Sequence, residues 1–141
     1  MGWDGSAQAA AALDAAKRLF GGTGELVLAE VISYEAAEDP QQASVTSADA
    51  GLAAIAANAD PAETPPRLEV LVGAPAEALA QFAQRLDVDV VVVGRRGRGL
   101  TRRLLGSVSS YLLEHSAVPV LIVDAVHSSA NSIRTTDKAP E

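Results

Sequence analysis

Glycines, arginines and serines gather in one segment of the chain, between residues 94 and 109. Small residues let a backbone approach a ligand closely, and amides at the start of a helix donate hydrogen bonds to phosphate oxygens. The small residues of this segment are Gly94, Gly97, Gly99 and Gly106. They are followed by Ser107, Val108 and Ser109, which offer amides where a helix is expected to begin. The pattern predicts a loop that binds a phosphate-bearing ligand.

The charge distribution points to the same loop. The chain has a net charge of −7, which argues against a surface that grips nucleic acid. Five of its 11 basic residues nevertheless fall within this loop, namely Arg95, Arg96, Arg98, Arg102 and Arg103. An acidic protein that concentrates arginines on a glycine-rich turn is expected to use them on an anion or on a partner's surface. A solvated run of charge is the alternative interpretation.

The sequence gives less support for a catalytic site or a metal-binding site. The chain has no cysteine, which excludes thiolate metal sites and disulfides and fits a cytoplasmic location. His115 and His127 are not spaced as metal ligands, and neither is placed as a base for Ser107 or Ser109. We therefore expect a binding protein without catalytic residues and without a dedicated metal site. Slow hydrolysis of a bound nucleotide is the most activity that this sequence suggests.

The surrounding sequence alternates helical and strand patterns. Helices are predicted around residues 9–20, 44–59 and 73–86 and from Gly106 onwards, with either Asp4 or Ser6 capping the first. Strands are predicted at residues 25–32, 67–72, 90–93 and 119–123. The uninterrupted valine run of residues 90–93 is typical of a parallel strand covered on both faces. This order predicts an α/β domain over residues 1–124, an open parallel sheet with helices on both faces, and a flexible tail over residues 125–141.

Two common phosphate-binding motifs do not fit the loop. Gly94-x4-Gly99 is followed by Leu100, so the lysine of a P-loop is absent. Gly97-x-Gly99 meets Arg102 where the third glycine of a dinucleotide fingerprint belongs. What remains is Gly94-x2-Gly97-x8-Gly106-Ser107. This spacing resembles the nucleotide-binding signature of the universal stress protein family, Gly-x2-Gly-x9-Gly-Ser/Thr.

The resemblance extends over most of residues 3 to 123. Trp3-Asp4-Gly5-Ser6 resembles the turn that ends the family's first strand, and the segment from Gly73 to Leu79 resembles its Gly-x-Pro-x-Glu-x-Leu helix opening. The segment from Pro119 to Val123 resembles its last strand. Two departures are visible: the loop has eight residues where the family has nine, and only Met1, Gly2 and Trp3 precede the Asp-Gly-Ser turn.

The resemblance implies a Rossmann-like fold with strand order 3-2-1-4-5 and a shortened first strand. It implies that ATP, AMP or cAMP is bound, with Mg²⁺ as an accompanying ion. Asp4 would contact the adenosine and Val31 would line the adenine pocket. The ribose and phosphates would be held by Gly94, Arg96, Gly97, Arg98, Gly106, Ser107, Val108 and Ser109, the two arginines compensating for the shorter loop.

Family resemblance also implies a homodimer, formed by the last strand from Val118 to Val123 and its copy. Three functions stay open at this point. The first is a nucleotide-binding protein of stress response or regulation. The second, favoured by the eight-residue spacing, is a dimeric protein-interaction module of the same fold without nucleotide. The third is an enzyme of the wider adenine-nucleotide hydrolase-like group, for which the sequence offers no catalytic residues.

Overall fold

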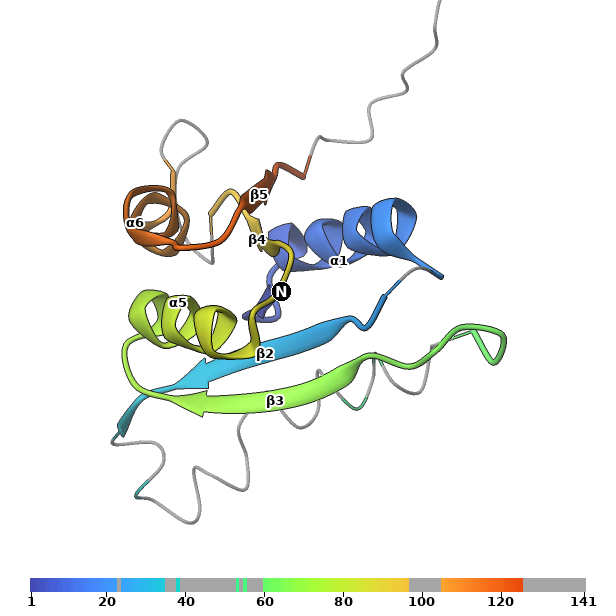
Figure 1. Ribbon diagram of the computed structural model, residues 1–141, viewed down its shortest axis with the longest axis horizontal. Helices are drawn as coiled ribbons and strands as arrows, with labels where there is room; N and C mark the ends of the chain where they lie inside the picture. The colour runs from blue at the N-terminus through green and yellow to red at the C-terminus, as the bar shows by residue number, and fades with distance from the viewer. Residues whose placement is uncertain are drawn as a thin grey trace, which may run out of the picture.

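The computed structural model describes residues 1–22, 24–34, 38, 53, 55, 60–96 and 105–125, and Figure 1 shows their arrangement. Strands and helices alternate along the chain, which confirms the predicted α/β class. The elements are β1 (Gly2–Trp3), α1 (Ala7–Phe20), β2 (Val27–Ile32), β3 (Arg67–Val72), α5 (Pro75–Leu86), β4 (Val91–Gly94), α6 (Ser107–His115) and β5 (Val120–Val123). Two predicted segments lie almost wholly outside this range: the helix at residues 44–59, of which only Ala53 and Ile55 are described, and the tail over residues 125–141, of which only Ala125 is described.

The strands form two parallel sheets where one was predicted. The first has the order β1-β2-β3, with Gly2 opposite Ala29, and the second pairs β4 with β5, with Val91 opposite Val120. The strand order within each sheet agrees with the predicted order 3-2-1-4-5. The predicted pairing of β1 with β4 is not confirmed, because no ladder links these two described strands. The first strand is shortened as predicted, and its two residues offer few groups for a second ladder.

Strand β4 is nevertheless covered on both faces, as its valine run predicts. Val92 packs with Ala12 and Ala16 of α1. Val91 and Val93 point the other way, into a cluster with Ala83 of α5 and Leu112 of α6. The alternation follows from strand geometry, in which successive side chains face opposite sides. Figure 1 shows the resulting layers, with α1 on one side of β4 and β5 and α6 on the other.

Local sequence explains how the first helix begins. Ser6 is the N-cap of α1 and its hydroxyl accepts a hydrogen bond from the Ala9 amide at 3.1 Å. The Asp4 carboxylate accepts from the Ser6 amide at 2.9 Å, closing a tight turn in which Gly5 has a φ of 72°. Of the two predicted caps, Ser6 is therefore the one that the structure uses. None of the helices in the described residues is long and apolar enough to cross a membrane.

Candidate functional site

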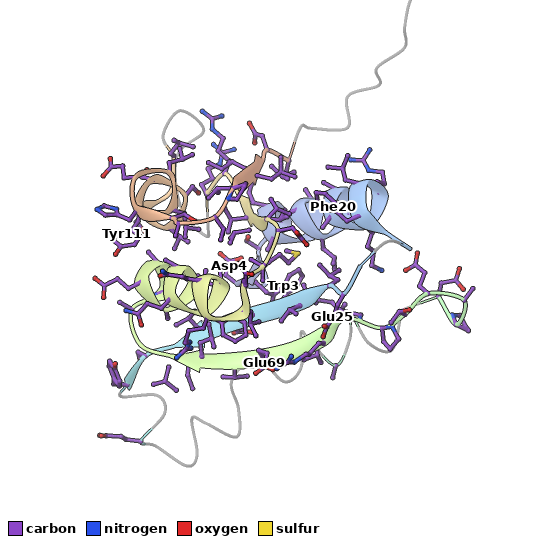
Figure 2. All side chains as sticks on the ribbon, in the orientation of Figure 1. Trp3, Asp4, Phe20, Glu25, Glu69 and Tyr111 are labelled. Atoms are coloured by element: carbon purple, nitrogen blue, oxygen red, sulfur yellow. The ribbon has the colours of Figure 1, made fainter. Side chains whose placement is uncertain are left out.

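The predicted site lies where strands end and helices begin. Asp4 follows β1, Val31 lies near the end of β2, and Gly94 ends β4. A Cβ on Gly94 would lie 2.8 Å from the Cβ of Gln8, so the end of β4 touches the start of α1. Asp4 and Gly94 therefore belong to one edge of the molecule, the edge at which open α/β sheets bind ligands. Asp4 is exposed at this turn. Figure 2 shows it close to Trp3.

Hydrogen bonds join the start of α6 to the end of β4. The amide of Gly106 donates to the carbonyl of Arg95 at 2.9 Å. The Ser109 hydroxyl is 1% exposed and lies 2.9 Å from the Gly94 carbonyl oxygen and 2.8 Å from that of Arg95. The hydroxyl proton is thus engaged with the backbone of β4. The structure gives this side chain a positioning role, whereas its predicted contact with a ligand stays a prediction.

Replacing Ser109 with alanine is expected to loosen this junction. The variant removes the hydroxyl donor to the Gly94 and Arg95 carbonyl oxygens, of which the second keeps its bond from the Gly106 amide. Losing such a partly buried hydrogen bond costs about 1–2 kcal/mol of unfolding free energy. Urea unfolding should show the loss. Ser107→Ala, an exposed position on the same helix, is the control and should leave the unfolding midpoint nearly unchanged. Equal stabilities of the two variants would contradict the positioning role of Ser109.

At the amino end of α6, no side chain of the described residues caps the backbone amides. Its N-cap is Gly106, in extended conformation with φ −67° and ψ 161°, and it has no side chain to accept from the helix amides. The first turn holds Ser107 on the surface and Val108 half-buried. Uncapped amides and the helix dipole together favour a bound anion at this end. This arrangement agrees with the predicted phosphate contacts of Gly106, Ser107 and Val108.

Two arginines follow β4 directly and have different surroundings. Arg95 donates to Asp124 at 3.0 Å, and this pairing holds the pKa of the Asp124 carboxyl below its usual value. Arg96 is half-buried, and its Nη1 atom is enclosed without a hydrogen-bond partner among the described residues. An enclosed guanidinium nitrogen needs an acceptor, which an anion supplies. Gly97 and Arg98, the other two predicted contacts in this loop, lie outside the described residues.

Sequence reasoning missed two polar residues at this edge. Gln8 is 8% exposed; its amide nitrogen donates to Asp124 at 3.3 Å and its oxygen accepts from the Ala125 amide at 2.8 Å. Asp124 therefore joins the start of α1, the end of β4 and the end of β5. One signal was present in the sequence, because Asp124 directly follows the last strand and so falls at the same edge as Arg95. Within the described residues, no three side chains are grouped to hold a metal ion.

Comparisons with known proteins place these features in a family. The sequence model of the universal stress protein family matches residues 1–124. The universal stress protein Sll1388 of Synechocystis sp. (strain ATCC 27184 / PCC 6803 / Kazusa) is 48% identical over 56 residues, which are 39% of this chain and 36% of that protein. The matched segment thus spans only about a third of that curated relative.

Two solved structures match most of the chain. A universal stress protein crystallised in complex with cAMP is 30% identical, with a TM-score of 0.61 over 89% of this chain and 94% of the other. The protein MJ0577 is 26% identical, with a TM-score of 0.74 over 90% of this chain and 94% of the other. The chain belongs to the universal stress protein family.

Proposed function

We propose that this protein binds an adenine nucleotide, ATP or the related AMP or cAMP, and acts as a regulatory protein of the stress response. The observation that carries the proposal is the uncapped start of α6 beside the enclosed Nη1 of Arg96. The amide of Gly106 bonds to the carbonyl of Arg95, so the helix start and this arginine are neighbours. The site combines backbone donors and a guanidinium, which is the chemistry that phosphate oxygens require.

The parts of the nucleotide are assigned to the residues as follows. The phosphates lie at the start of α6, held by the amides of Ser107 and Val108 and by Arg96, while Gly94 and Gly106 allow close approach. Asp4, exposed at the turn after β1, accepts from the ribose hydroxyls, and Val31 packs against the adenine. Gly97 and Arg98 complete the loop side, and Mg²⁺ accompanies the triphosphate. Ser109 acts through the junction that it holds.

We propose binding without efficient catalysis. A general base within reach of a reacting group is the usual mark of hydrolytic enzymes, and the residues assigned here comprise amides, guanidinium groups and one exposed carboxylate. The alternative is a nucleotide-free interaction module of the same fold, which the eight-residue loop spacing favours. We expect the protein to act in the cytoplasm, because its 141 residues include no cysteine that an oxidising compartment would pair.

Nucleotide carried through purification separates the two functions. The full chain is purified without added nucleotide and denatured, and the supernatant is analysed by chromatography and mass spectrometry. We expect ATP, AMP or cAMP in a near-stoichiometric amount, or micromolar binding when the nucleotide is added back in a calorimeter. An empty supernatant together with a flat titration would favour the interaction module.

We also propose that the protein forms a homodimer through the last strand, from Val118 to Val123. Strand β5 lies at the outer edge of the β4-β5 sheet, and its four residues are all half-buried. A strand edge with apolar side chains is suited to pairing with a second copy. Replacing Leu121 and Val123 together with lysine should give a monomer in sedimentation velocity, because it places charges at the interface. A dimer that persists in this variant would locate the interface elsewhere.

A further inference from the structure

A carboxylate lies beside the arginines that follow β4 and is paired with one of them. Asp124, the first residue after β5, accepts a hydrogen bond from Arg95 at 3.0 Å through one oxygen. Its other oxygen accepts from the Gln8 amide nitrogen at 3.3 Å. The position follows from strand register, because Gly94 pairs with Val123 and the next residues of the two strands lie opposite each other. Asp124 is thus fixed at the edge where β4 ends.

Arg95 joins this carboxylate to the phosphate-binding end of α6. Its amide donates to the Val123 carbonyl at 2.8 Å, and its carbonyl accepts from the Gly106 amide at 2.9 Å. The Arg95 backbone therefore bridges β5 and the helix start, while its side chain is turned to Asp124. Charges in physiological salt interact over roughly 8–10 Å, so the carboxylate acts on a phosphate bound at this helix start.

Asp124 is ionised at neutral pH and interacts with both arginines. The hydrogen bond from Arg95 lowers the pKa of the Asp124 carboxyl most, and the Gln8 bond and the Arg96 charge act in the same direction. The interaction is mutual, so the carboxylate offsets positive charge that the arginines would otherwise present to an anion. Among the described residues that directly follow β1, β4 and β5, the carboxylates of Asp4 and Asp124 balance the two arginines.

We propose that Asp124 is a selectivity residue, which weakens the binding of a nucleotide in proportion to the charge of its phosphates. This inference rests on the proposed nucleotide site and states which nucleotides that site favours. A cyclic monophosphate carries about one charge, a 5′-monophosphate about two and a triphosphate about four. A carboxylate near the phosphates therefore weakens a triphosphate most. Asp124 shifts the selectivity of the site toward nucleotides of low phosphate charge.

A purely structural role for Asp124 would give the opposite sign. If the carboxylate only held Arg95 in place, its removal would weaken the binding of every nucleotide. The ion pair is partly exposed, with side-chain exposures of 31% for Arg95 and 42% for Asp124, and such pairs stabilise a structure little. The Arg95 backbone is also held independently of its side chain, by the bonds to Val123, Gly106 and the Ser109 hydroxyl. The charge of Asp124 is therefore the property that reaches the ligand.

Asp124→Asn tests the sign of the effect. Asparagine keeps an oxygen that can accept from Gln8, and it removes the charge that holds Arg95. Calorimetric titration of the full chain, in EDTA and low salt, gives the affinities for ATP, AMP and cAMP. We expect the ATP affinity to rise about three- to tenfold, the AMP affinity to rise less and the cAMP affinity to change by less than about twofold. The ratio of ATP to cAMP affinity within one variant cancels changes in stability.

Glu69→Gln is the matched control for charge. Glu69 also accepts from an arginine, Arg67, at 2.7 Å, and its substitution also removes one negative charge. It lies on β3, the outer strand of the other sheet, and Figure 2 shows it well apart from Asp4. We expect its ratio of ATP to cAMP affinity to equal that of the unsubstituted chain. Equal gains in the two variants would show an effect of net charge alone and would overturn the selectivity role of Asp124.

A double-mutant cycle with Arg95→Gln separates charge from structure. Arg95→Gln leaves Asp124 without its cation, so the ATP affinity should fall. The variant with both substitutions should return to within about twofold of the unsubstituted chain, because the pair has no net charge in either case. A structural role instead predicts weaker ATP binding in all three variants.

Two further outcomes are decisive. An unchanged or lower ratio of ATP to cAMP affinity in Asp124→Asn would overturn the selectivity role and leave the nucleotide site in place. Absence of binding of all three nucleotides, by the unsubstituted chain and by every variant, would overturn the proposed function and this inference with it.

Discussion

Gly106→Asp is expected to abolish adenine-nucleotide binding while leaving the fold intact. Gly106 is the N-cap of α6, and aspartate is among the preferred N-cap residues. Its carboxylate would accept from the amides that the proposal assigns to phosphate, and its charge would repel the phosphates. We expect an affinity loss of at least about a hundredfold, which corresponds to roughly 2.7 kcal/mol. Calorimetric titration with ATP measures the loss, and thermal unfolding should show a Tm equal to or above that of the parent.

Gly106→Asn is the matched control for charge. Asparagine has nearly the shape of aspartate and also caps helices, but it is neutral. It should compete for the same amides without repelling phosphate, so we expect an intermediate loss of about tenfold. Unchanged ATP affinity in the aspartate variant would remove the start of α6 from the nucleotide site.

Gly94→Ala is expected to destabilise the fold by about 2 kcal/mol, because it overpacks a tight contact. The added Cβ would lie 2.8 Å from the Cβ of Gln8 and 2.9 Å from its carbonyl carbon. The second of these is a backbone atom, so α1 must shift away from β4 to make room. We expect the Tm to fall by roughly 6–10 °C. Displacement of Gln8 should also weaken its bonds to Asp124 and Ala125.

Gly24→Ala provides the comparison for Gly94→Ala. A Cβ on Gly24 would meet nothing within 4 Å, and its φ lies outside the range that favours glycine. Both variants reduce the conformational entropy of the unfolded chain by replacing one glycine. The difference between their Tm values therefore isolates the effect of the contact with α1. We expect Gly24→Ala to leave the Tm unchanged or slightly raised. Similar Tm values for the two variants would show that α1 can move away from β4 at Gln8 without a loss of stability.

The bounds of most helices and strands follow from nearby residues. Gly21 follows the last residue of α1 and Pro75 begins α5, two residues later than the predicted start at Gly73, because these residues free or restrict the backbone locally. The valine run before Gly94 predicts a strand covered on both faces, and the structure confirms it. The strand itself runs from Val91 to Gly94, one residue later than predicted, since its register is fixed by pairing with Val120 to Val123.

The predicted site is only partly decided by local sequence. The glycine-rich loop and the helix start at Gly106 could be predicted, because small residues before a helix let a ligand approach the backbone closely and meet free amides. The direction of the Ser109 hydroxyl could not be predicted from the sequence, since its partners are carbonyl groups 14 and 15 residues earlier. A hydroxyl at a helix start is equally suited to a phosphate and to a buried carbonyl, and only packing distinguishes them.

The sequence by itself determined the alternation of strands and helices, the family and the loop that carries the candidate site. These depend on periodicity and on short motifs, which act over a few residues. The tertiary structure decided which distant groups meet. Gln8 and Asp124, 116 residues apart, share a hydrogen bond. Strand pairing was decided in the same way: among the described strands, β1, β2 and β3 form one parallel sheet and β4 and β5 form another.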